Sequence, residues 1–118
     1  MLATTLDAKA VLEAEGLHVS CGTPQSLWIA ATVQDMGDGI KLSPDACSLI
    51  WDSRRWVAVF PAEGLLTYEV PGTLPELVSV IVSVYRQLRR AGGRMSDAFR
   101  QVVGDAEQYL VGRSLSQV

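Results

Sequence analysis

The sequence is short of the residues on which most enzymes and secreted domains depend. Its 118 residues include one histidine, His18, and two cysteines, Cys21 and Cys47. It has no HExxH pattern, no glycine-rich phosphate loop and no Cys-x-x-Cys pair, so the common metalloprotease, nucleotide and dithiol motifs are missing. We expect both cysteines to be buried thiols in a reducing compartment, with no disulfide between them. These shortages favour a protein that is not an enzyme and holds no cofactor or metal.

Long hydrophobic runs are also missing, and charged residues make up only 19% of the chain. No apolar run reaches the 18 or so residues that a membrane-spanning helix needs. Residues 1–16 include acidic residues and lack the apolar centre of a signal peptide, so we expect a cytoplasmic protein without a membrane role. Apolar residues make up 48% of the chain, more than a small monomer readily buries. We therefore expect a twofold homodimer or a protein partner.

Charge is unevenly spread along the chain. Residues 1–52 hold two lysines against seven acidic residues, whereas residues 53–118 hold eight arginines against six. The net charge of the whole chain is −3, and no RNA- or DNA-binding signature is present. Both observations argue against nucleic acid as the ligand.

The stretch 73–93 (TLPELVSVIVSVYRQLRRAGG) carries the clearest structural pattern. Thr73 and Glu76 match a capping box, and Gly92 and Gly93 end the pattern. Apolar side chains cover an arc of roughly 200° around the axis, twice the width that a surface helix needs. We predict a helix that packs against a sheet and against a second helix. The β-branched run would also suit a strand through residues 77–85, but the caps and the polar face favour the helix.

Alternating and helical spacings predict the other elements. A short helix begins at Thr4 or Thr5 and ends at Gly16, and its predicted buried side consists of Leu6, Ala10, Val11 and Ala14. Strands are expected at 17–21, 27–34, 40–42, 47–51, 55–60 and 65–70, and a last helix at 96–111. This order predicts one α+β domain over residues 1–118, with helices on one face of an antiparallel sheet of five or six strands. The other face of strands 47–70 is also largely apolar, which adds to the case for association.

Three groups of residues are candidates for partner binding. Trp51 and Trp56 flank a hairpin turn, where they pair across the strands as part of the sheet or anchor a binding face, as can Trp28. The arginines near the end of the long helix complement its dipole or grip an acidic partner. Asp35 and Asp38 lie in a glycine turn that lacks the ligand spacing of a calcium loop. The candidate residues are Trp28, Trp51, Trp56, Asp35, Asp38, Arg86, Arg90 and Arg94.

One segment also resembles a known class of proteins. Residues 48–90 (SLIWDSRRWVAVF…LLTYEV…TLPELVSVIVSVYRQLRR) combine short strands carrying tryptophans, a final strand and a long amphipathic helix. This pattern resembles small α+β immunity proteins of bacterial toxin systems. The resemblance implies a cytoplasmic protein that neutralises a toxin by covering its active site, and the acidic N-terminal half would suit a basic toxin.

The sequence is also compatible with two other functions. The first is a small enzyme or ligand-binding domain with a pocket between the sheet and the helices, which Trp28 would line. The second is a secretion-chaperone-like or phage accessory protein, since helix-flanked sheets of chaperone-like domains share the same pattern.

Overall fold

The chain folds into a mixed α+β structure built on a six-stranded antiparallel sheet. The computed structural model describes residues 5–23, 25–37, 40–42 and 45–112, with side chains omitted at 34–36 and 40–42. The elements in order are α1 (Thr5–Ala14), β1 (His18–Thr23), β2 (Ser26–Ala30), β3 (Gln34–Gly37), β4 (Ile40–Leu42), β5 (Cys47–Trp51), β6 (Trp56–Pro61), β7 (Leu66–Gly72), α2 (Leu74–Ala91), α3 (Met95–Val103), the short 3₁₀ helix η1 (Ala106–Tyr109) and β8 (Leu110–Gly112).

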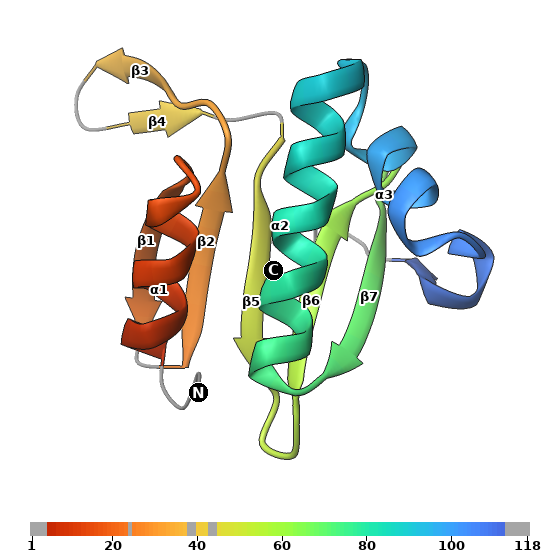
Figure 1. Cartoon of the computed structure of the whole chain (residues 1–118), viewed down its shortest axis with the longest axis horizontal. Coiled ribbons are helices and arrows are strands. Elements are labelled where there is room, and N and C mark those ends of the chain that lie inside the picture. The colour runs from red at the N-terminus through yellow and green to blue at the C-terminus, as the bar shows by residue number, and fades with distance from the viewer. Residues whose placement is uncertain (1–4, 24, 38–39, 43–44, 113–118) are drawn as a thin grey trace.

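The strands lie side by side in the order β1-β2-β5-β6-β7-β8, and every neighbouring pair is antiparallel. The helices α1, α2 and α3 all lie on one face of this sheet, with α2 crossing its middle (Figure 1). The predicted fold class is therefore confirmed. Strands β3 and β4 pair only with each other and form a separate two-stranded sheet beside the main one. Among the described residues, no helix combines the length and the apolar character that crossing a membrane requires.

Helix α2 begins and ends where the sequence predicts. The Thr73 side chain accepts from the Glu76 amide, and the Glu76 side chain accepts from the Thr73 amide, which completes the capping box. The amide of Gly92 donates to the carbonyl of Leu88 at 2.7 Å and closes the last turn. Six of its side chains are buried against the sheet and the other helices: Leu74, Leu77, Val78, Ile81, Val84 and Tyr85. This packing offsets the weak helix propensity of the β-branched residues.

An aromatic cluster holds α3 on β6 and β7. The ring of Phe99 stacks on that of Tyr68 with centroids 4.4 Å apart, and it also contacts Phe60 at 5.1 Å. Tyr109 of η1 meets the edge of Phe99 at 6.0 Å. Because such aromatic pairs add to the gain from burial, they fix α3 over this end of the sheet.

The predicted buried side of α1 is wrong. The buried residues are Ala8 and Leu12, while Leu6 is 70% exposed and Val11 is 39% exposed. Both sets share helical spacing, so the apolar pattern of this short alanine-rich helix did not define one face.

Two other boundaries also differ from the predictions. The last helix ends at Gly104, whose φ of 88° favours glycine, and the chain continues as η1 and β8 instead of running to residue 111. The strand predicted at 27–34 ends at Ala30, and Gln34–Gly37, part of which was predicted as a turn, forms β3. The prediction that both thiols are buried is wrong for Cys21, which is exposed on the edge strand β1, and is confirmed for Cys47 on the central strand β5.

Candidate functional site

Trp51 and Trp56 lie together at one end of the sheet, beside the beginning of α2. They line a surface hollow of about 620 Å³ that we call the tryptophan hollow. Its walls come from the β5–β6 hairpin and from the connection between β7 and α2, namely Trp51, Arg54, Arg55, Trp56, Pro71, Gly72, Thr73, Leu74, Pro75 and Glu76. It joins two segments that are some twenty residues apart in the sequence.

The two tryptophans face each other across the last rung of the β5–β6 ladder. Their ring centroids are 5.6 Å apart with the planes tilted by 59°, a favourable aromatic arrangement. Both side chains are half-buried, so each ring keeps a surface open to solvent. On its other side, Trp56 pairs with Gly72 of β7, which has no side chain to cover the ring. The hollow thus has a preformed aromatic floor.

The hairpin beside the tryptophans is held by Asp52. Its Oδ1 accepts hydrogen bonds from the amides of Arg54 at 3.3 Å and Arg55 at 3.1 Å. Ser53, which lies between Asp52 and Arg54, adopts a left-handed φ of 81°. Slight desolvation would raise the pKa of Asp52, but these hydrogen bonds and the charge of Arg55 outweigh it and hold the pKa below its usual value. The Asp52 carboxylate therefore serves the turn itself.

The opposite wall is equally fixed. Oε1 of Glu76 accepts from the Thr73 hydroxyl at 2.7 Å and from the Thr73 amide at 3.1 Å. The side-chain hydrogen bond and then the backbone one lower the pKa of Glu76. Pro71 and Pro75 stiffen the chain on either side. Because this wall is already fixed, a ligand that binds to it would have to order few additional residues.

The charged group of the tryptophan hollow that stays available to a ligand is positive. The guanidinium of Arg54 has no partner among the described residues, and Arg55 lies 3.7 Å from Asp52 in an exposed pair of little strength. Asp52 and Glu76, the acidic residues nearby, already accept the hydrogen bonds described above. The tryptophan hollow therefore combines an apolar floor with one unpaired cation.

The other predicted residues do not join this site. Trp28 pairs with Ser20 and Ser48 on the face of the sheet away from the helices. Asp35 lies in β3 without a described side chain, and Asp38 is outside the described residues. The structure thus brings together only two of the three tryptophans.

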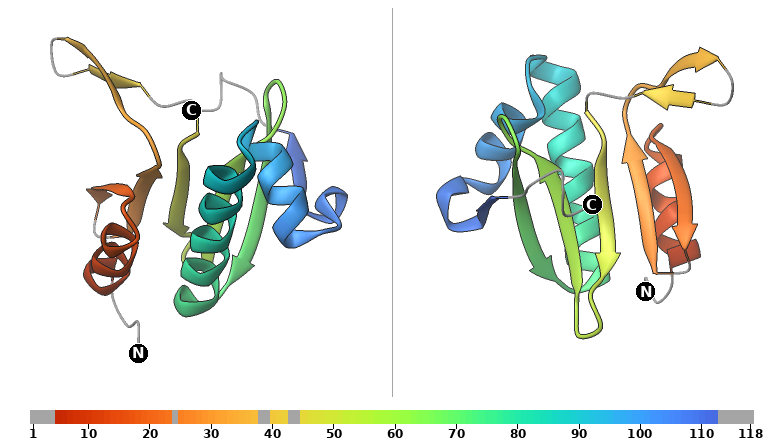
Figure 2. Two further views of the ribbon diagram at one scale, coloured as in Figure 1. Left: turned by 45° about the horizontal axis from the view of Figure 1, so that its top comes forward. Right: turned by 180° about the vertical axis from the view of Figure 1, so that it is seen from behind.

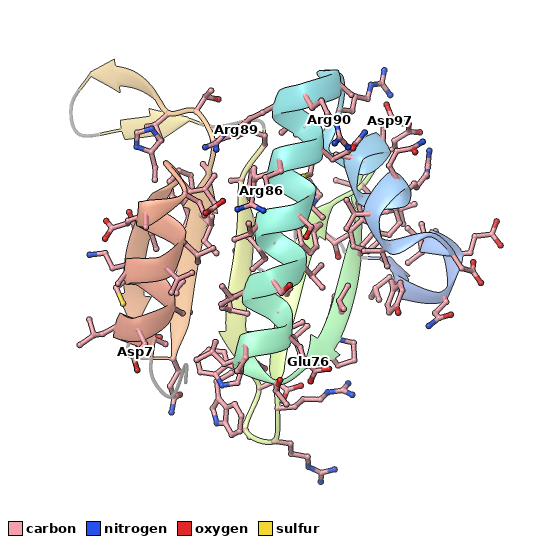
Figure 3. The ribbon with its side chains drawn as sticks, in the orientation of Figure 1. Asp7, Glu76, Arg86, Arg89, Arg90 and Asp97 are labelled. Atoms are coloured by element: carbon pink, nitrogen blue, oxygen red, sulfur yellow. The ribbon has the colours of Figure 1, made fainter. Side chains whose placement is uncertain are left out.

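The predicted arginine group is divided among contacts within the chain. Arg86 forms an ion pair with Glu15 at 2.7 Å, and Arg90 donates to Gln87. Arg89, which belongs to the same group, donates to the carbonyls of Glu15 at 2.7 Å and Gly16 at 3.1 Å. Figure 3 shows Arg86 and Arg89 on the side of α2 that faces α1, and Arg90 on the side of α3. Arg86 and Arg89 thus join α2 to the end of α1, while Arg90 bonds within its own helix, so the three do not form one surface patch.

Arg94 lies in a second hollow of about 510 Å³, between the β6–β7 turn and the turn from α2 to α3. There it forms an ion pair with Glu63 at 3.1 Å. Arg94 therefore has an acidic partner within the chain, whereas the guanidinium of Arg54 has none among the described residues.

No described cluster of side chains has the composition of a metal site. The only described buried thiol, Cys47, is held protonated because burial raises its pKa to about 12, although a hydrogen bond with Tyr85 opposes the shift. A protonated buried thiol is a poor nucleophile. Side chains such as Leu49, Phe60 and Ile81 fill the centre of the layer between sheet and helices, and the hollow beside Arg94 lies at one end of it.

Comparison with models of protein families, with curated proteins and with solved structures gave no match.

Proposed function

We propose that this chain is a non-enzymatic protein-binding module that holds its partner in the tryptophan hollow. The observation that carries the proposal is the open Trp51–Trp56 pair beside the unpaired Arg54. Tryptophan and arginine are, with tyrosine, enriched among the residues that contribute most to binding at protein interfaces. Rigid walls also reduce the entropy lost on binding.

The charge of the hollow selects the chemistry of the partner. Arg54 and Arg55 would attract a carboxylate, while the tryptophan rings and the two prolines would take an apolar side chain. The expected occupant is an exposed protein segment that places an aspartate or glutamate beside a large apolar residue. A basic segment would meet like charge at the rim.

Immunity to a bacterial toxin stays a prediction within this proposal. It adds the requirement that the partner is a toxin whose active site the chain covers. None of the described acidic residues of the N-terminal half, which would suit a basic toxin, lines the tryptophan hollow, so a toxin bound in the hollow would have to present an acidic segment.

The test is affinity capture from the native host with matched variants, followed by binding measurements with the purified partner. We expect a protein that is retained by the wild type and by Trp28→Ala but lost with Trp56→Ala. Trp28→Ala is the matched control because Trp28 is also half-buried but lies on the other face of the sheet. The Trp56→Ala change should weaken binding of the purified partner at least tenfold, as truncation of a central interface tryptophan does.

Arg54→Glu tests the role of charge separately, because the Arg54 side chain makes no hydrogen bond or ion pair with the described residues. Reversal of its charge should weaken the same partner while leaving the circular dichroism spectrum unchanged. Equal capture by wild type, Trp56→Ala and Arg54→Glu would refute binding in the hollow, as would the absence of any specifically retained protein.

A further inference from the structure

Strand β1 forms an outer edge of the six-stranded sheet, and no described segment lies along its free side (Figures 1 and 2). Residues 18–23 contain no lysine, proline or acidic residue, which are the usual means of blocking a sheet edge against another chain. The one irregularity is a bulge between Cys21 and Thr23. Between His18 and Cys21 the edge is regular and exposed except for the half-buried Val19. We call these four residues the β1 edge.

The alternation of hydrogen bonds decides which backbone groups the β1 edge presents. The amide of Trp51 donates to the carbonyl of Gln25 at 2.9 Å, so Gln25 and every second residue after it bond to β5. The residues between them bond to the other side, because successive residues direct their backbone groups to opposite sides of a strand. Trp28 therefore bonds to β1, where its partner is Ser20.

Since the backbone of Ser20 bonds to β2, those of Val19 and Cys21 face outward. Their N–H and C=O groups have no hydrogen-bond partner among the described residues. The β1 edge thus has one outward-facing residue on each side of Ser20, so its backbone groups can pair with those of a second copy of the same strand. About a twofold axis at Ser20, Val19 would pair with Cys21 of a second copy, and Cys21 with its Val19. Each pair exchanges two hydrogen bonds, which gives four in total.

Helix α1 offers a second contact above the same edge. A hollow of about 490 Å³ lies against the edge and includes Glu13 of α1 and Val19 in its lining. Leu6 precedes Glu13 by seven residues, or two turns, and so shares its side of the helix. At 70% exposure, Leu6 is the most exposed large apolar side chain of the described chain.

The spacing of a twofold pair suits these helices. Neighbouring strands lie about 4.8 Å apart and α1 covers β1 and β2 (Figure 1), so the two copies of α1 would lie roughly 10 Å apart, close to the usual distance between packed helices. Lys9 lies one turn before Glu13, so an antiparallel copy would present the opposite order of charges. Both the backbone and the helix side therefore match a second copy of this chain.

We propose that two copies of this chain associate through the β1 edge and form one continuous antiparallel sheet across a twofold axis. The interface consists of the backbone of Val19 and Cys21 and the Leu6 side of α1. It lies apart from the tryptophan hollow, so a dimer keeps both hollows available.

Light scattering after size-exclusion chromatography tests the association. We expect twice the single-chain mass of 12.8 kDa at micromolar concentration for the wild type and for Cys21→Ser. Cys21→Pro removes an outward N–H but no bond to β2, so it should shift the mass to that of one chain. Leu6→Glu should lower the dimer fraction, whereas Leu65→Glu, at an exposed leucine in the β6–β7 turn, should not.

Disulfide trapping then locates the axis and does not depend on whether the proline variant folds. In a Cys21→Ser background, Ser20→Cys should form an intermolecular disulfide under mild oxidation. Residues opposed in a non-hydrogen-bonded pair have Cα atoms about 4.5 Å apart, within disulfide range. His18→Cys in the same background is the control, because residue 18 would lie opposite Gly22 of the second copy, four residues along the strand from its own counterpart. A single-chain mass for the wild type, or trapping at 18 as strong as at 20, would overturn the proposal.

Discussion

The N-terminal unit of α1, β1 and β2 and the central unit of β5, β6, β7, α2 and α3 share one sheet but are held in different ways. The central unit encloses the large aromatic side chains, including Phe60, Phe99 and Tyr85, with almost no exposed surface. The N-terminal unit has no aromatic residue in its core, and α1 buries only Ala8 and Leu12. Packing of apolar side chains therefore dominates the central unit, whereas the N-terminal unit has few buried side chains.

Polar contacts from α2 compensate for this thin packing. Arg86 pairs with Glu15, Arg89 binds the carbonyls that follow α1, and the Tyr85 hydroxyl donates to Ile29 at the end of β2. All three residues belong to α2, and Figure 3 shows Arg86 and Arg89 on the side of this helix that faces α1. Helix α2 thus serves as the core of one unit and as the polar attachment of the other. The two units should respond differently to changes in packing, in pH and in side-chain charge.

Ile81→Asp should have the largest effect. Ile81 has no exposed surface and lies in the middle of α2, so an aspartate there buries a charge without a partner. The cost of several kcal/mol is comparable with the stability of a small domain. We expect loss of the folded circular dichroism spectrum. Ser79→Asp, on the exposed side of the same helix, is the control, and a folded Ile81→Asp protein would contradict the packing described above.

Tyr85→Phe should destabilise the chain by about 1–3 kcal/mol, because two carbonyls lose their hydrogen-bond donor. The hydroxyl lies 3.0 Å from the carbonyl of Ile29 and 2.6 Å from that of Asp45. These two residues lie before and after the segment that contains β3 and β4. Urea denaturation measures the change. Tyr109→Phe is the control, because the ring of Tyr109 packs on Phe99 without a described hydrogen bond from its hydroxyl. Equal effects of the two changes would show that the Tyr85 contacts add nothing.

The central unit was predictable from sequence to the extent that its signals are local. The capping box of α2, its glycine stop and the Trp51–Trp56 spacing all lie within a few residues, and local geometry decides each of them. The end of α3 was missed because Val102, Ala106 and Tyr109 keep helical spacing across Gly104. The left-handed conformation of that glycine ends the helix, and the pattern alone does not show it.

The candidate site and the attachment of α1 depend on contacts between distant segments. Nothing near Trp56 in the sequence indicates that Gly72 and Pro75 complete its hollow, since the register of β6 with β7 decides it. Likewise, Glu15 and Arg86 are separated by 71 residues, so the sequence showed an arginine cluster where the structure has separate ion pairs. Hydrophobic periodicity predicts which elements form but not which polar groups meet.

The buried thiol gives the central unit a pH dependence. Burial raises the pKa of Cys47 from 9.0 to about 12, so the folded chain keeps a proton that the unfolded chain releases above about pH 9. Stability should therefore be constant with respect to this group below about pH 9 and fall as the pH rises toward 12. The loss between pH 8 and pH 10 should be about 1 kcal/mol. Cys47→Ala should remove this part of the slope in urea denaturation, and a slope that is the same with and without the Cys47 thiol would contradict this prediction.

Arg89→Met should have the smallest effect and should fall on the N-terminal unit alone. Methionine keeps much of the side-chain volume but loses the two hydrogen bonds to the carbonyls of Glu15 and Gly16, where a cation also complements the end of α1. We expect about 1 kcal/mol, seen as faster amide hydrogen exchange in residues 5–23 with unchanged exchange in β6 and β7. Arg90→Met is the matched control, because Arg90 contacts only Gln87 of its own helix. Faster exchange spread evenly over both units would mean that they open together, and the contrast between them would then be wrong.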